Sequence, residues 1–260
     1  MNQLRYSKIF SAGGWIVEPW LAEGIHHGFL DKSYDLSRPR WEWEVLDYPQ
    51  EFKNLQLLKQ IHSSLVFCCE SNPVPENSAG NSEPGAMPEG DGWYGLHPSP
   101  TKQILMGIKT ADCIPVLLID QSRKYRAALH CGWRSAAQQI LTKTLKIFKQ
   151  QNILPATIEI ALGPGAQACC YEVGEEVFQE FSLSAHALGF DLHSQKIRVD
   201  TVNQSYLSVS NFLIAEAQAF GIKATNIYNT NVCTICDQRL FSFRREADAS
   251  GRQLSFITNF

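Results

Sequence analysis

The stretch that decides the fold runs from residue 104 to residue 150 and reads ILMGIKTADCIPVLLIDQSRKYRAALHCGWRSAAQQILTKTLKIFKQ. Three short apolar runs bounded by turn residues, at 104–108, 114–119 and 125–129, predict three β-strands. From Ser135 to Gln150, apolar side chains recur every three or four positions with lysine and glutamine between them. That spacing predicts an amphipathic helix packed against the sheet.

Outward from this stretch, strands and helices alternate irregularly. Residues 157–162 and 223–228 predict further strands, whereas 173–181 and 203–220 predict helices, the second of which ends at Gly221. Some neighbouring strands are joined by only a few residues and others by helices, so we expect mixed β-sheets rather than a doubly wound parallel sheet. The pattern therefore predicts an α+β fold.

Length and composition favour one folded domain, which we expect to span residues 1–260. With 260 residues, of which 44% are hydrophobic and 19% charged, the chain can bury a large core. The stretch 71–90 is rich in Pro, Gly, Ser, Asn and Glu and cannot contribute to that core. It predicts a long mobile loop, which either covers a site or is a dispensable insertion.

The charge balance excludes some classes of partner. A formal net charge of −3 gives no overall positive field for nucleic acid or an anionic membrane, so a small-molecule substrate is expected. The N-terminal residues lack the apolar segment of a secretory signal, and no run of about 18 apolar residues predicts a membrane span. We therefore expect a cytoplasmic protein whose eight cysteines are mostly reduced thiols.

Three side chains that favour metal binding lie beside predicted strands or turns: His62 in KQIHSS, Cys113 in TADCIP and His130 in LHCGW. Imidazole and thiolate are usual zinc ligands, and a catalytic zinc has three protein ligands and one open position. The spacing of 51 and 17 residues matches no compact zinc motif, so a buried cysteine and two hydrogen-bonded histidines are an alternative. A Cys113 nucleophile with His130 or His62 as its base is another.

The remaining cysteines do not predict a second centre. Cys233 and Cys236 form a CxxC that in isolation is typical of a redox motif or of half a zinc ribbon, but no second CxxC completes a ribbon. We interpret them as structural thiols. The adjacent cysteines at 68–69 and 169–170 are likewise interpreted as packing residues.

Seven segments occur in a specific order along the chain: KQIHSSLVF, DGWYG, KTADCIPVLLID, ALHCGWRSA, GPGAQACCYEVGEEV, NVCTICDQRLFSFRRE and GRQLSFI. Together they resemble the YfiH-like or laccase-domain family, described as multifunctional purine nucleoside enzymes, from Leu55 to Ile257. The resemblance implies mixed β-sheets flanked by helices, in a layered α/β/β/α sandwich. It also implies a zinc ion bound by His62, Cys113 and His130.

The resemblance further implies the chemistry. The reactions are phosphorolysis of adenosine, guanosine, inosine and S-methyl-5′-thioadenosine, and hydrolytic deamination of adenosine to inosine, with purine nucleosides and phosphate as partners. An older description of the family, as copper-dependent polyphenol oxidases, makes copper the alternative metal. Seven histidines without a His-x-His pair argue against a multicopper centre. A binding protein with a structural zinc is the non-enzymatic alternative.

Five polar residues near these motifs are candidates for contact with substrate or phosphate: Arg134, Asp91, Asp112, Arg244 and Arg245. The arginines are candidates to bind phosphate or ribose, with a surface or carboxylate-paired role as the alternative. The aspartates are candidates to orient ligands or transfer protons, with a turn as the alternative. Ser135 stands where the family has glycine, and as a good N-cap it is expected to preserve the helix start.

Overall fold

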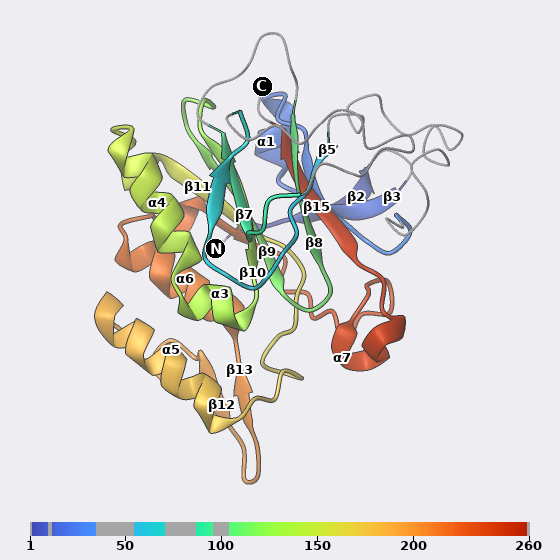
Figure 1. Cartoon of the computed structure of the whole chain (residues 1–260), viewed down its shortest axis with the longest axis vertical. Helices are drawn as coiled ribbons and strands as arrows, with labels where there is room; N and C mark the ends of the chain where they lie inside the picture. Colours follow the sequence, from blue (N-terminus) through green and yellow to red (C-terminus); the bar gives the residue numbers. More distant parts are fainter. Residues whose placement is uncertain (1, 10–11, 35–54, 71–86, 96–103, 259–260) are drawn as a thin grey trace.

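Two mixed β-sheets packed face to face form the centre of the structure (Figure 1). The computed structural model describes residues 2–9, 12–34, 55–70, 87–95 and 104–258. The first sheet has seven strands in the order β1 (Asn2–Gln3), β14 (Ile227–Asn229), β11 (Ile158–Leu162), β9 (Ile114–Asp120), β10 (Arg126–Cys131), β7 (Gly92–Gly95) and β6 (Val66–Cys68). The second has six, in the order β2 (Arg5–Ile9), β3 (Ala12–Ile16), β4 (His27–Leu30), β15 (Gln253–Thr258), β8 (Leu105–Thr110) and β5 (Leu55–Gln56).

Both sheets combine parallel and antiparallel pairs, which confirms the predicted α+β class with mixed sheets. In the seven-stranded sheet, β11, β9, β10 and β7 pair antiparallel, while β1, β14 and β11 at one side and β7 and β6 at the other pair parallel. In the six-stranded sheet only β5 and β8 pair parallel. A two-stranded hairpin, β12 (Arg198–Asp200) with β13 (Ser205–Leu207), completes the described strands.

Helices cover the outer face of the seven-stranded sheet. They are α3 (Trp133–Ala137), α4 (Ile140–Gln150), α5 (Glu175–Leu188) and α6 (Val209–Ala219), and Figure 1 shows them together on one side of β9, β10 and β11. Strand β9 explains this layering. Val116 and Leu118 pack in the cluster under the helices, whereas Leu117 and Ile119 pack in the cluster between the sheets. A strand buried on both faces needs a continuous apolar run, which the sequence shows at 114–119.

The described residues thus supply three of the four predicted layers: helices, the seven-stranded sheet and the six-stranded sheet. The cluster on the outer face of the six-stranded sheet consists of strand residues and Tyr34. The short helix α1 (Glu18–Ala22) packs Trp20 into the cluster between the sheets, and α7 (Phe243–Glu246) precedes β15. No helix in the described part of the chain is long and apolar enough to cross a membrane.

Several predicted boundaries are corrected by the structure. The helix expected at 135–150 is two helices, because Gln139 takes a left-handed conformation with φ 60° and interrupts it. Gly132, not Ser135, caps the first of them; the Ser135 hydroxyl instead donates to the carbonyl oxygens of His130 and Gly132. The N-cap prediction for Ser135 was therefore wrong.

The C-terminal helix and its flanks also differ from expectation. The helix predicted at 203–220 spans only 209–219, because residues 205–207 form strand β13. The helix predicted at 173–181 begins at Glu175 and continues to Leu188. The strand predicted at 223–228 is β14, three residues long. Of the predicted mobile loop, residues 71–86 lie outside the described residues.

The register of the seven-stranded sheet brings distant segments to one edge. The first residues of β9 lie opposite the last residues of β10 and β11, and β14 ends beside the end of β11. The first residues of β6 and β7 lie at the same edge, next to the end of β10. Segments that enter or leave these strands are therefore neighbours, although they are up to 170 positions apart.

Candidate metal centre

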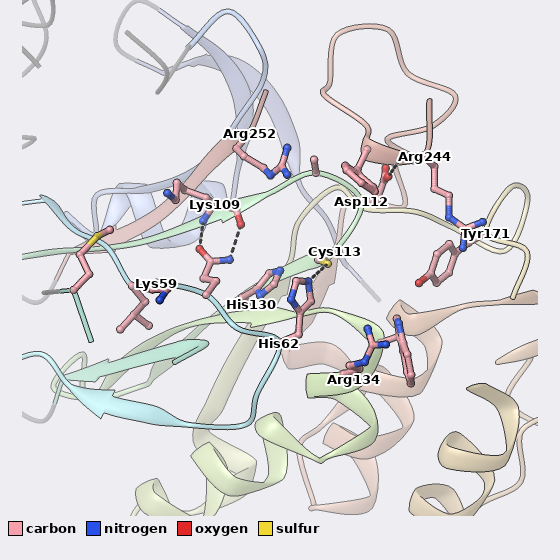
Figure 2. A pocket seen from close by; sticks show the side chains of 16 residues that line it. Lys59, His62, Lys109, Asp112, Cys113, His130, Arg134, Tyr171, Arg244 and Arg252 are labelled. Carbon is pink, nitrogen blue, oxygen red and sulfur yellow. Dashed lines mark hydrogen bonds between the residues drawn. The ribbon is translucent and has the colours of Figure 1, made fainter. Parts of the chain in front are cut away.

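His62, Cys113 and His130 meet at this edge of the sheet (Figure 2). Cys113 immediately precedes β9, His130 is the penultimate residue of β10, and His62 lies in the segment between β5 and β6. One side-chain ligand atom from each of the three lies within 4.8 Å of the others. The Cys113 Sγ and the His62 Nε2 are 4.0 Å apart, and the two imidazole centroids are 5.0 Å apart.

The backbone is constrained where it presents these side chains. His62 has φ 59° and Asp112, next to Cys113, has φ 84°. Both lie in the left-handed region, which residues other than glycine rarely adopt. Gly132 follows β10, and a Cβ there would come within 3.0 Å of the His62 ring and 3.1 Å of the Cys113 Sγ. A side chain there would press on two of the three candidate ligands, so glycine favours this close approach of the start of α3, which gives the HxGW pattern a physical reason.

Asp91 holds the two histidines in place. Its Oδ1 lies 2.8 Å from the His130 Nδ1 and accepts the backbone N–H of His62 at 3.0 Å, while Oδ2 accepts the backbone N–H and hydroxyl of Ser63. The carboxylate is fully buried. Burial alone would raise its pKa, but the hydrogen bonds from His130 and Ser63 lower it. An imidazole whose Nδ1 donates to a carboxylate presents Nε2 to a metal, which is the usual arrangement at zinc sites.

Cys113 and His130 have strongly perturbed pKa values. Burial opposes ionisation of the thiol, yet His130 and His62 lower the pKa of Cys113 to about 6. Burial also disfavours the imidazolium, yet Cys113 and Asp91 raise the pKa of His130 to about 9. The two groups therefore form a thiolate–imidazolium pair near neutral pH. A divalent cation would bind the thiolate and displace the imidazolium proton, so this donor set fits a metal ion.

The three side chains lie in a pocket of about 510 Å³. Aromatic and cationic side chains dominate its other walls; they are Trp133, Tyr171, Phe243, Lys59, Lys109, Arg134, Arg244 and Arg252. The Arg134 guanidinium lies 4.2 Å from the Trp133 ring centroid, and that of Arg244 lies 5.0 Å from the Tyr171 centroid. Figure 2 shows Arg244 and Tyr171 on the side of the pocket opposite Lys59.

Most of these cations lack an anionic partner. Among the described residues, Lys59 pairs with Glu89, but Lys109, Arg134, Arg244 and Arg252 form no ion pair with a carboxylate. Burial and the nearby charge of Arg252 lower the pKa of Lys109, which shows that the two cations lie close to each other. Cations gathered without counter-charges favour binding of an anionic group in this pocket.

The candidate arginines separate into two groups. Arg134 and Arg244 line the pocket, as a contact with substrate requires. Arg245 does not line it: its guanidinium donates to the carbonyl oxygens of residues 234, 235 and 240 and pairs with Glu246. Arg245 therefore stabilises the loop before α7.

Neither candidate aspartate presents a free carboxylate to the pocket. Asp91 lies behind His130, as described above. Asp112 lines the pocket, but its Oδ1 accepts the Thr234 hydroxyl at 2.6 Å and its Oδ2 accepts the backbone N–H of Arg244 at 2.7 Å. These bonds attach the Cys113 turn to α7 and to the loop before it, so a positioning role fits Asp112 better than proton transfer.

Sequence reasoning missed five pocket residues: Lys59, Lys109, Arg252, Tyr171 and Phe243. Lys109 is the penultimate residue of β8, and Arg252 immediately precedes β15, the strand paired with β8. Their proximity depends on the pairing of β8 with β15, which no local pattern encodes. The sequence also missed that two cysteine pairs, 169–170 and Cys233 with Cys236, come together.

Several known proteins are similar to this chain. A family model described as multi-copper polyphenol oxidoreductase laccase matches residues 39–259. A purine nucleoside phosphorylase of Clostridium acetobutylicum is 31% identical over 208 residues, which cover 79% of this chain and 77% of that protein. The adenosine deaminase RL5 of an unknown prokaryotic organism is 31% identical over 155 residues, covering 59% of this chain and 58% of that one.

A solved structure is similar along its whole length. The crystal structure of the hypothetical protein YfiH of Bacillus licheniformis matches with a TM-score of 0.77, covering 99% of each chain at 20% identity. At this identity the likeness establishes the fold, and it confirms the predicted fold class.

Proposed function

This chain belongs to the family described as multi-copper polyphenol oxidoreductase laccase, and we propose that it is a zinc-dependent purine nucleoside enzyme. The proposed reactions are phosphorolysis of adenosine, guanosine, inosine and S-methyl-5′-thioadenosine to the free base and the sugar 1-phosphate, and hydrolytic deamination of adenosine. Relatives that are a purine nucleoside phosphorylase and an adenosine deaminase support both activities. The proposed zinc ligands are His62, Cys113 and His130.

The observation that carries the proposal is the composition of one pocket. It places the His62, Cys113 and His130 donor set beside aromatic walls and cations, most of which have no carboxylate partner among the described residues. Aromatic rings bind the flat face of a purine, and cations bind phosphate. A nucleoside and an inorganic phosphate are the pair of substrates that needs both.

In phosphorolysis, a phosphate oxygen forms a bond to C1′ of the ribose while the bond from C1′ to N9 of the purine breaks. The purine leaves with the electron pair and takes up a proton. Lys109 and Arg252, adjacent cations without a carboxylate partner in the described chain, are proposed to bind the phosphate. Tyr171, Trp133 and Phe243 are proposed to hold the base and exclude water from it.

In deamination, water adds to C6 of adenine and the amino group leaves as ammonia. A zinc ion bound by the three ligands would supply the Lewis acid that activates water for this attack. The chain's own contribution is orientation: Asp91 fixes the His130 ring and the backbone of His62, and Asp112 fixes the turn that carries Cys113. Preorganised ligands keep the reacting atoms aligned without reorganisation during the step.

Copper is the alternative metal, because two histidines and one cysteine are also the ligands of blue-copper centres. A multicopper oxidase needs several further histidines near that centre. The other histidines of the described residues do not supply them: both ring nitrogens of His27 bond to backbone groups, and His26 lies beside it in a different pocket. His186 and His193 are exposed on the α5 side. The geometry therefore favours the nucleoside activities over phenol oxidation.

A metal-free thiol hydrolase is the second candidate, favoured by the pKa of about 6 for Cys113 beside His130. It makes the opposite prediction about metal removal. Chelation would leave its activity intact, and alkylation of the thiol would abolish it.

The test is product analysis by liquid chromatography. Zinc-loaded parent protein is incubated with adenosine, inosine or S-methyl-5′-thioadenosine, with and without phosphate, beside His62→Ala and Cys113→Ala. His186→Ala, on the exposed face of α5, and Cys68→Ser are matched controls. Free base that appears only with phosphate, and inosine that appears without it, both lost in the two site variants, would support the proposal. Unchanged nucleosides with the fully loaded parent would refute it.

A further inference from the structure

The same sheet edge carries a second group of metal-binding side chains. Strands β11 and β14 are parallel neighbours, so the loops that follow them, 163–174 and 230–242, leave the sheet side by side. Backbone hydrogen bonds join the loops: the Gly165 N–H donates to the Val232 carbonyl, and the Thr234 N–H donates to the Gly165 carbonyl. Each loop carries two cysteines, at 169–170 and at Cys233 with Cys236.

The four sulfur atoms converge. All lie within 4.8 Å of one another, and the Cys236 Sγ is 3.1 Å from that of Cys170 and 3.8 Å from that of Cys169. The four side chains are free thiols. Sulfur ligands about 2.3 Å from a tetrahedral zinc lie about 3.8 Å from one another, so the group needs only small side-chain adjustments to accept the ion.

The backbone around Cys233 has the form of a metal-binding turn. The Asp237 N–H donates to the Cys233 carbonyl and closes the CxxC turn. Burial opposes ionisation of the Cys233 thiol, but the neighbouring backbone N–H groups lower its pKa. A lowered pKa favours the thiolate, the form that binds a metal.

We propose that Cys169, Cys170, Cys233 and Cys236 bind a second zinc ion in a structural site distinct from the pocket. Four thiolates complete a tetrahedral shell and leave no open position, which is typical of structural zinc. On binding, the four thiols release their protons to solvent and the ion joins the two loops. The adjacent cysteines of the first loop take the place of the second CxxC that a zinc ribbon would have.

The proposed site would stabilise two walls of the pocket. Tyr171, next to Cys170, lies beneath the Arg244 guanidinium. Thr234, between Cys233 and Cys236, donates its hydroxyl to Asp112, which precedes Cys113. Fixing the two loops to each other therefore fixes the aromatic wall and the turn that carries Cys113.

Metal stoichiometry tests the proposal without any enzyme assay. Full-length protein is prepared under reducing conditions, loaded with zinc, freed of excess and analysed by mass spectrometry of elements. We expect about two zinc ions per chain in the parent, about one in Cys236→Ser and about one in Cys113→Ala. Cys68→Ser, a cysteine outside both groups, should retain about two.

X-ray absorption at the zinc edge identifies the ligands and does not require the Cys236 variant to fold. The zinc that Cys113→Ala retains should have four sulfur ligands and no nitrogen. Equal zinc content in Cys236→Ser and the parent would overturn the proposal, as would nitrogen ligands in that spectrum. A disulfide between Cys170 and Cys236 in the reduced, freshly purified parent would overturn it too.

The outcome is separable from that of the proposed function. Loss of nucleoside turnover with two zinc ions bound would refute the activity and leave the four-cysteine site standing. If the parent binds one zinc ion that Cys113→Ala loses and Cys236→Ser retains, the four-cysteine site is refuted. The proposed function is then still open to the product analysis described above.

Discussion

Replacing Asp91 by asparagine tests whether this carboxylate prepares the two histidines for a metal. The side chains have almost the same shape, so the change removes a charge and one acceptor without opening a cavity. Asp91 accepts from the His130 ring, the His62 backbone, and the Ser63 backbone and hydroxyl. An asparagine would replace one of the two carboxylate oxygens by an NH₂ group, which cannot accept a hydrogen bond. In one orientation it would face the donors of His62 and His130, and in the other those of Ser63.

The expected loss follows from these contacts. A hydrogen bond to a charged group contributes about 1.5–3 kcal/mol, and removal of the oxygen acceptor behind a metal-binding histidine costs about 10–100-fold in metal affinity. We therefore expect the dissociation constant for zinc at His62, Cys113 and His130 to rise about 10–100-fold, which is about 1.4–2.8 kcal/mol. Because Asp91 is fully buried, bulk salt should change this loss little.

The measurement is competition with a chelator of known affinity, carried out in the Cys236→Ser background so that zinc at the four cysteines does not contribute. Ser63→Ala is the matched control, because it removes one donor to Asp91 but keeps the charge and the His130 contact. Its affinity should stay within about threefold of the parent. Circular dichroism of the metal-free proteins confirms that each variant folds. Equal affinity for zinc in folded Asp91→Asn and in its parent would refute the reasoning.

Three further predictions concern stability and the phosphate subsite. Burial raises the pKa of Glu216 from 4.5 to about 7, so the folded state binds a proton that the unfolded state releases between these values, and stability falls as pH rises through this window. From pH 4 to pH 8, the free energy of unfolding in urea should therefore fall by about 3 kcal/mol less in Glu216→Gln than in the parent. Equal pH profiles would contradict this. Lys109→Met and Arg252→Met should each raise the KM for phosphate about tenfold or more while adenosine deamination stays within about twofold, as measured by initial rates at varied phosphate; an equal loss of both activities would argue against a phosphate subsite. Phe148→Ala removes a fully buried ring from α4 and should cost about 3–5 kcal/mol of unfolding free energy in urea titration, and a cost below about 1 kcal/mol would show that the helix layer can collapse onto the cavity.

Much of the sheet could be predicted because its signals are local. Residues 114–119 are apolar without alternation, and the strand they form is buried on both faces. The mixed pairing also followed from the short connections between the central strands. These features depend on side chains and turns within a few positions of each other.

Helix boundaries failed where the backbone departs from the helix although the apolar spacing continues. The apolar spacing at 135–150 continues through Gln139, yet the backbone there is left-handed and the helix breaks. Residues 203–220 have helical spacing throughout, but Ser205 to Leu207 pair with β12 instead. A hairpin partner, visible only in the folded chain, decided that conformation.

The candidate site divides in the same way. The resemblance led to His62, Cys113 and His130 because each lies in a recognisable motif, and the structure brings their ligand atoms within 4.8 Å. Lys109 and Arg252 have no motif, and their proximity requires the pairing of β8 with β15. The four cysteines require the parallel pairing of β11 with β14, so neither cysteine pair alone predicts the group.

Asp112 links the two groups of candidate metal ligands that share one sheet edge. Its backbone, with φ 84°, turns the chain from β8 of one sheet into Cys113 and β9 of the other. The Ala166 N–H donates to the Asp112 carbonyl, and the Asp112 carboxylate accepts the Thr234 hydroxyl and the Arg244 N–H. Arg244 belongs to α7, whereas Thr234 belongs to the loop that also carries Cys233 and Cys236. The position of the Cys113 sulfur therefore depends on how rigidly that loop is held. An ion at the four cysteines would therefore act on the pocket through the Asp112 turn as well as through the wall that Tyr171 forms.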